Sequence, residues 1–271
     1  MKKTRLILAF FLISMRAIAG DVDTSVVYRF YDFNAFIAPC GSFQYSIFGV
    51  STYGINNTME IEAHPLMLFF SPSVDLKYKL TRFGDINISG ISGFNYPTIL
   101  MRLITKKGTG GFISPEFKIP QMISIRNGVV GTYRISEQHF ISGRVLFEFA
   151  INNNALEPGT SIDLPLIAPH SAVYYNDAGL SFAIAGEGTV YSFISYHCKS
   201  ELLIFPFISQ EYKDEYPLGQ QSFFVDFSGT AVWRLSETAI ISTGFKLTYG
   251  DYPFGGQWHL LPTIDFKKWL D

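Results

Sequence analysis

The chain has 271 residues, enough for one large all-β domain, so its length does not require a second domain. The formal net charge is −2 and 16% of the residues are charged, which excludes both a basic surface for nucleic acid and an acidic solvating tail. Nearly half of the residues (48%) are hydrophobic, and the aromatic ones are mostly Phe and Tyr, which favour strands and membrane interfaces.

Residues 1–19 have the features of a signal peptide. Positive charges within Lys2–Arg5 precede an apolar run over Leu6–Ile13, and Ala17–Ala19 supplies the small residues of a cleavage site. An uncleaved membrane anchor is the less favoured alternative, because the apolar run is well short of the roughly 20 residues of a spanning helix. We therefore expect an exported protein whose residues 20–271 form one domain.

Period-two alternation of apolar and polar residues is the strongest signal in the rest of the chain. Within 222–235, apolar residues such as Phe227 and Trp233 occupy one face, and polar residues such as Asp226 and Arg234 occupy the other. Many alternating segments reach about 10 residues, the length that a tilted strand needs to cross a bilayer. The pattern predicts strands at 25–33, 41–51, 58–69, 73–81, 85–94, 113–134, 138–151, 169–185, 189–203, 220–234, 238–250 and 258–267.

These segments predict an antiparallel transmembrane β-barrel of about 12 strands. An extra hairpin made from Ile99–Thr105 and Gly111–Ile119 would raise the number to 14. The alternative class is a soluble β-sandwich, in which the same apolar faces would point inward rather than toward lipid.

The connections support the barrel because short and long ones lie on opposite sides. Short turns are predicted at Gly54–Asn57, Arg82–Asp85, Ser136–Gln138, Gly186–Gly188 and Ser236–Thr238. Longer loops are predicted at Asn95–Ser114, Asn152–Ala168, Glu201–Gln220 and Asp251–Gln257. Both chain ends then fall on the short-turn side.

Two segments resemble parts of bacterial outer-membrane β-barrel proteins. The alternating strand from Trp258 to Lys267 is similar to the terminal strand by which such barrels are recognised for assembly, although Lys268–Asp271 extend beyond it. The run Gly54–Leu80, with its Lys77-Tyr78 pair, resembles a hairpin element of these barrels. The resemblance implies the outer membrane of a Gram-negative type of cell, with membrane lipid and the barrel-assembly machinery as partners, and it implies no activity.

On the barrel interpretation the polar faces line the lumen. The charged candidates are Glu60, Glu62, Asp75, Lys77, Lys79, Arg126, Arg134, Arg144, Glu148, Asp226, Arg234, Lys246 and Asp265. Both signs are present, so one interpretation is a set of ion pairs that stabilises a wet lumen, and the other is a ladder that binds a solute. The carboxylates on 58–69 are expected to pair with the lysines on 73–81 across neighbouring strands.

No catalytic residue, cofactor site or metal site is assigned. Ser195 and His197 share a strand face, but side chains at that spacing are about 7 Å apart, too far for a hydrogen bond. Cys40 and Cys198 can form a disulfide in an oxidising compartment or remain separate thiols. Tyr28, Phe30, Tyr133, Trp233, Tyr249, Trp258 and Trp269 are candidates for interfacial girdles, with ordinary strand aromatics as the alternative.

Three functions are compatible with these features. The first is a narrow, porin-like channel for small solutes. The second is a structural or interaction barrel with a plugged lumen and exposed loops. The third is an outer-membrane hydrolase acting on lipid, which would need a serine and a histidine within hydrogen-bond distance near one rim.

Overall fold

The structure is a computed structural model that describes residues 33–105, 113–157, 160, 165, 167–191, 193–206, 221–252 and 254–270. The signal peptide, nearly all of the strand predicted at 25–33, and the candidates Tyr28 and Phe30 lie outside these residues. The strands are β1 (Phe43–Ser46), β2 (Ser51–Asn56), β3 (Met59–Ala63), β4 (Ser73–Phe83), β5 (Ile86–Asn95), β6 (Met122–Arg134), β7 (His139–Asn152), β8 (Ala178–Tyr191), β9 (Ile194–Ile204), β10 (Phe223–Arg234), β11 (Ala239–Tyr252) and β12 (Gly255–Leu270).

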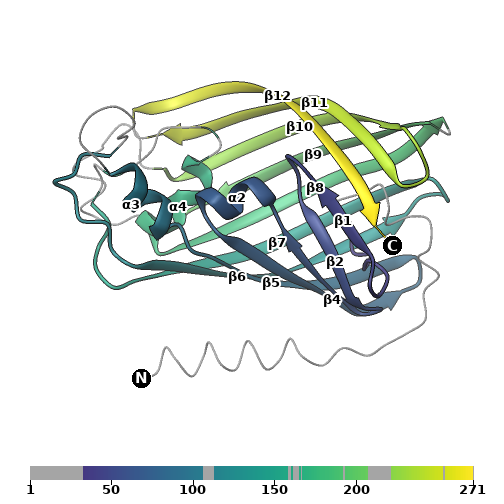
Figure 1. Cartoon of the computed structure of the whole chain (residues 1–271), viewed down its shortest axis with the longest axis horizontal. Coiled ribbons are helices and arrows are strands. Elements are labelled where there is room, and N and C mark those ends of the chain that lie inside the picture. The colour runs from purple at the N-terminus through teal and green to yellow at the C-terminus, as the bar shows by residue number, and fades with distance from the viewer. Residues whose placement is uncertain are drawn as a thin grey trace.

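These 12 antiparallel strands form one closed barrel (Figure 1). Each strand pairs with its neighbours in sequence, and β1 closes the ring by pairing with β12, from Phe43 opposite Leu270 to Ser46 opposite Lys267. The predicted number of 12 strands is confirmed. Short turns and the end of β12 lie at one end of the barrel, here called the turn end, and three helices gather toward the other, the loop end.

Large apolar side chains point outward around the ring. They are exposed on strands throughout the barrel: Ile61, Phe94, Val129, Val145, Phe182, Phe227, Phe245 and Leu260 are examples. A soluble monomer does not carry a continuous apolar surface of this extent, whereas a transmembrane barrel presents such a band to lipid. The barrel is therefore transmembrane. Its apolar strand faces point outward and its polar faces point into the lumen, as the sequence predicts.

The helices belong to connections at the loop end. They are α2 (Pro65–Phe70), α3 (Thr98–Ile104) and α4 (Ala168–Asn176). In α2 the His64 side chain accepts the Met67 N–H at 3.4 Å as an N-cap, and Pro65 occupies the first turn, where its missing N–H costs nothing. None of the described helices is long and apolar enough to cross a membrane.

Strand β12 is much longer than the β1 strand that it closes on. Asp265 marks the end of their pairing, because its carboxylate accepts hydrogen bonds from Ser46 Oγ at 2.7 Å and from Phe48 N at 2.8 Å in the β1–β2 turn. Over Gly255–Ile264, no described strand pairs with β12 on its β1 side. Pro262 lies in this stretch, consistent with the confinement of proline to strand edges.

Apolar clusters occupy both ends of the lumen, and the largest two are at the loop end and the turn end. At the turn end, Phe36 from the N-terminal side of β1 packs on Phe140 and Trp269. At the loop end, α4 packs against α3 and inward-facing residues of the strands, with Tyr174 and Phe224 almost completely buried. The sequence pattern predicts a polar lumen, and the apolar material at both ends is a departure from it.

Several predicted boundaries are wrong in informative ways. The extra hairpin at 99–119 is absent because residues 98–104 form α3, and the segment that would join its two strands lies outside the described residues. Part of the strand predicted at 169–185 is α4, which begins at Ala168 and has Pro169 in its first turn, where proline is well tolerated. The turn predicted at 186–188 lies inside β8, and the loop predicted at 251–257 is a short connection between β11 and β12. The strands predicted at 41–51 and 58–69 are replaced by β1, β2, β3 and α2.

The aromatic candidates divide between outer surface and lumen. Tyr133 and Trp258 are exposed, and the Tyr249 ring lies 4.7 Å from the Trp258 ring, so an aromatic cluster lies on the surface at the loop end. Trp233 is half-buried. Trp269 is only 3% exposed and packs in the lumen, so its assignment to a girdle is wrong.

Candidate functional site

A charged chamber lies between the largest apolar clusters at the two ends of the lumen. Its volume is about 350 Å³, and it is partly open rather than a sealed void. Nine charged side chains line it: Glu62, Asp75, Arg126, Arg144, Glu148, Lys199, Glu201, Asp226 and Lys246. Five carboxylates and four cations in one enclosed space can coexist only with ion pairing and water, because an isolated charge there is costly.

The first ion pair joins strands that are not neighbours. Arg126 on β6 donates from Nε and Nη2 to the two carboxylate oxygens of Asp75 on β4, at 2.5 and 2.6 Å. The pair passes over Gly93 on β5, where a Cβ atom would lie 1.7 Å from Asp75 Oδ1. This bidentate pair can therefore form only because the residue between its partners on β5 has no side chain. Glu148 flanks Arg126 across β6–β7 and accepts from Ser124 Oγ.

A second cluster uses the same arrangement farther around the ring, on β7, β8 and β9. Arg144 on β7 reaches Glu201 on β9, with Nη2 at 3.0 Å from Oε1, and Ala183 is the register partner of both on the intervening β8. Glu201 also accepts from Lys199 Nζ at 2.8 Å and from Ser181 Oγ at 2.5 Å. One carboxylate therefore holds two cations in place.

Two further pairs complete the charged lining. Lys246 on β11 lies 2.7 Å from Asp226 on β10. Lys77 on β4 binds both Glu60 and Glu62 on β3, with 2.8 Å to Glu62, and all three side chains are largely buried. The sequence predicts this cross-strand pairing for the carboxylates of β3. In the described contacts, Lys77 binds both of them.

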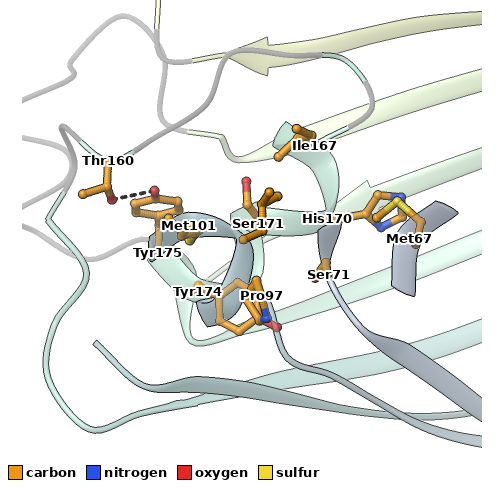
Figure 2. A pocket seen from close by; sticks show the side chains of 11 residues that line it. Met67, Ser71, Pro97, Met101, Thr160, Ile167, His170, Ser171, Tyr174 and Tyr175 are labelled. Atoms are coloured by element: carbon orange, nitrogen blue, oxygen red, sulfur yellow. Dashed lines mark hydrogen bonds between the residues drawn. The ribbon is translucent and has the colours of Figure 1, made fainter. Parts of the chain in front are cut away.

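His170 on α4 connects the chamber with a small apolar pocket (Figure 2). That pocket has a volume of about 30 Å³ and lies between Met67 of α2, Met101 of α3 and the Ile167–Tyr175 segment. Although the His170 ring keeps surface accessible from the chamber, removal from bulk water lowers its pKa to about 4, and repulsion by Lys246 and Arg126 adds to this shift. His170 is therefore neutral near pH 7.

The described chain before β1 does not itself line the chamber, but it packs beside two cations of the chamber wall on the turn-end side. Residues Phe33–Ala38 have neither helical nor strand structure, yet all six are buried inside the barrel. The Phe33 ring lies 4.5 Å from the Arg144 guanidinium carbon and 5.7 Å from Lys199 Nζ, so two cations of the chamber contact this ring.

Only some of the charged residues predicted to face the lumen line the chamber. Seven of them line the chamber: Glu62, Asp75, Arg126, Arg144, Glu148, Asp226 and Lys246. Glu60 and Lys77 are buried against Glu62, and Lys79 is half-buried farther along β4. Arg134 and Arg234 end their strands at the turn end, and Asp265 binds the β1–β2 turn instead of lining the chamber.

The chamber residues that sequence reasoning missed are Lys199, Glu201 and His170. Lys199 and Glu201 lie within the strand predicted at 189–203 and on the same face as Ser195 and His197, so continuing that alternation would have identified them. His170 belongs to a helix folded into the lumen, for which the alternating pattern contains no signal.

Ser195 and His197 do not form a pair in the described contacts. Ser195 Oγ lies 3.0 Å from Thr189 Oγ1, and His197 Nε2 lies 3.5 Å from Glu187 Oε1. Cys40 and Cys198 are both free and exposed, so they are separate thiols in this structure.

No protein-family model matches the chain, and no curated protein does so either. Among solved structures, it is similar to a loop-deleted form of OmpT, an outer membrane protein of Vibrio cholerae, with 12% identity and a TM-score of 0.44 over 84% of this chain and 62% of that one. The outer membrane channel DcaP of Acinetobacter baumannii gives 7% identity and 0.41, over 90% and 69% of the two chains. OprD of Pseudomonas aeruginosa gives 9% and 0.40, over 90% and 64%.

The chain thus spans 62–69% of the length of these three proteins. The similarities are weak, and the barrel assignment rests on the strand pairing and outer surface described above.

Proposed function

We propose that this protein is an outer-membrane channel of narrow bore for small charged or zwitterionic solutes. The observation that carries this proposal is the chamber, which retains about 350 Å³ of space beside nine charged side chains. A barrel with a purely structural role would fill its interior with packed side chains, as small barrels do. Here ion pairs draw the long side chains of Arg126, Arg144 and Lys246 to the wall, and the space between them remains for water or solute.

The mixed charges favour solutes that carry both signs. Arg144 and Lys199 on one side, and Glu62 and Asp75 on the other, offer partners for a carboxylate and an ammonium group. Because each cation already has a carboxylate partner, a passing solute exchanges ion pairs instead of binding to a bare charge. Weak exchange of this kind permits both entry and exit, which conduction requires.

Conductance in planar bilayers tests this function. Purified protein is expected to produce discrete current steps, and Lys246→Glu should shift the reversal potential in a salt gradient toward cation selectivity. Lys268→Glu is the matched control, because Lys268 is exposed at the turn end of β12 and does not line the chamber. No current steps from any form of the protein, or equal shifts from both substitutions, would contradict a channel through this chamber.

A plugged interaction barrel is the second candidate, and one observation favours it. Apolar clusters occupy both ends of the lumen, around Phe36 and Trp269 at one end and around Tyr174 and Phe224 at the other. In that case the connections between β7 and α4 (153–167) and between β9 and β10 (205–222), only partly within the described residues, would bind a partner. Shortening them would abolish partner binding while the barrel still assembles.

A further inference from the structure

Six consecutive residues before β1 run inside the barrel as irregular chain. From Phe33 to Ala38 every residue is less than 9% exposed, although none belongs to a helix or strand. Irregular backbone at membrane depth is tolerated only inside protein or beside water, and its polar groups must find partners. The contacts of this segment therefore show how the barrel holds it.

Its centre is fixed to two strands. The Ala35 N–H donates to Thr132 Oγ1 on β6 at 2.8 Å, and Ser89 Oγ on β5 donates to the Ala35 carbonyl at 2.6 Å. Thr132 and Ser89 are both completely buried. Hydroxyl side chains here replace the backbone partners that a strand would have.

The two ends of the segment are bound to carboxylates on opposite parts of the wall. Phe33 N donates to Glu187 Oε1 on β8 at 3.1 Å, and Ala38 N donates to Glu60 on β3. The segment consequently crosses the lumen from β8 to β3. All of these contacts come from side chains of the wall, so its departure would break no strand pairing in the barrel.

Aromatic contacts link the segment with the wall and with the chamber. Phe36 packs edge-to-face on Phe140, with ring centroids 5.6 Å apart. Phe33 contacts Arg144 and Lys199, and both cations are also held by Glu201. The N-terminal end of the segment thus rests on the same ion-pair cluster that a solute in the chamber would meet.

The chain turns sharply where the segment leaves the lumen. Gly41 has a φ of +79°, which a residue with a side chain rarely adopts, and its N–H donates to the Gly54 carbonyl at 2.8 Å. The C-terminal end of the segment is therefore fixed beside β2, while the contacts described for the part before it are made by side chains of the wall.

We propose that Phe33–Ala38 is the gate of the channel: it closes the turn-end exit of the chamber, and it opens by releasing its side-chain contacts and moving about the turn at Gly41. This inference rests on the proposed channel function. A permanently packed plug would not move in this way. The ring of 12 paired strands stays closed whether the segment is in place or released.

A reversible cross-link tests the gate. Ala35→Cys and Ser89→Cys are combined in a protein whose native thiols are removed by Cys40→Ser and Cys198→Ser, and Ser89→Cys without Ala35→Cys is the matched control. We expect the oxidised double-cysteine protein to show no current steps, reduction to restore them, and the control to be indifferent to oxidant. Phe33→Ala should raise the open probability about fivefold, as the loss of two cation–π contacts implies.

The outcomes separate the gate from the channel. Equal currents from oxidised and reduced protein, with Phe33→Ala unchanged and Lys246→Glu still altering selectivity, would leave the channel and overturn the gate. No current from any variant, including one with Phe33–Ala38 replaced by glycine and serine, would overturn both. Heat-dependent migration in SDS gels shows whether the double-cysteine protein assembles. If it does not, Phe33→Ala and the glycine–serine variant test the gate instead: higher open probability supports it, and unchanged open probability overturns it.

Discussion

Arg126 on β6 and Asp75 on β4 form a bidentate ion pair across the strand that lies between them. The distances are 2.5 and 2.6 Å, and the pair passes above Gly93 of β5. This contact shows one way in which the lumen is organised: two charges reach past a strand because the residue between them has no side chain. Ala183 lies in the corresponding position between Arg144 and Glu201.

Gly93→Ala should therefore break the Arg126–Asp75 pair. The new Cβ would lie 1.7 Å from Asp75 Oδ1, so the carboxylate must move. We expect a loss of about 2 kcal/mol in the free energy of unfolding, typical of hydrogen bonds to charged groups. Urea titration of protein folded into vesicles measures it. Gly186→Ala is the control, because nothing lies within 4 Å of its Cβ, and equal losses would refute the role of Gly93.

Charge on the outer face should be tolerated only near the barrel ends. Ile184 is 59% exposed in the middle of β8, so Ile184→Arg should destabilise the protein by about 2–4 kcal/mol, the cost near the bilayer midplane. Phe83→Arg, beside the turn at Gly84, should cost about 1 kcal/mol or less. The same vesicle-based titration compares them, and similar values for the two variants would argue against a membrane at this height.

Glu201→Gln should release two cations into the chamber. Arg144 and Lys199 both lose their shared carboxylate, so we expect a shift toward anion selectivity in a salt gradient. Glu237→Gln, in the exposed β10–β11 turn, is the charge-matched control and should leave the reversal potential unchanged. An unaltered reversal potential in Glu201→Gln would show that ions do not pass this cluster.

His170 should make stability depend on pH. Its pKa is lowered to about 4 in the folded protein, whereas the unfolded chain protonates a histidine near pH 6.5. Between these values the unfolded state binds the extra proton, so the stabilisation is complete above about pH 6.5 and is lost as pH falls toward about 4. His170→Gln should remove this contribution, and unfolding titrations at pH 7 and 4.5 measure the difference. Identical pH dependence in both proteins would contradict the assigned shift.

The regular strands could be predicted from sequence because outward apolar and inward polar residues alternate along them. The prediction fails where that alternation stops. Phe140-Ile141, Phe223-Phe224 and Ile240-Ile241 are consecutive apolar pairs at strand ends, and one member of each pair points into the lumen to meet a cluster there. Those pairs were a readable signal of material inside the barrel.

The gate segment and α4 could not be located in the same way. Alternation reports which face of a strand a residue occupies, but it says nothing about which other segment folds into the lumen. The burial of Ala35 and Phe36 depends on Thr132, Ser89 and Phe140, which lie more than 50 residues away. Such contacts follow from closure of the ring and become visible only in three dimensions.

In a transmembrane barrel the outward face of each strand meets lipid and the inward face meets water. Nitroxide labels at Phe245→Cys and Lys246→Cys, in protein without its native cysteines, test consecutive positions of β11. Position 245 should collide more often with molecular oxygen, which concentrates in lipid, and position 246 with a water-soluble nickel chelate. The reverse preference, or the same preference at both positions, would contradict a barrel that faces lipid outside and water within.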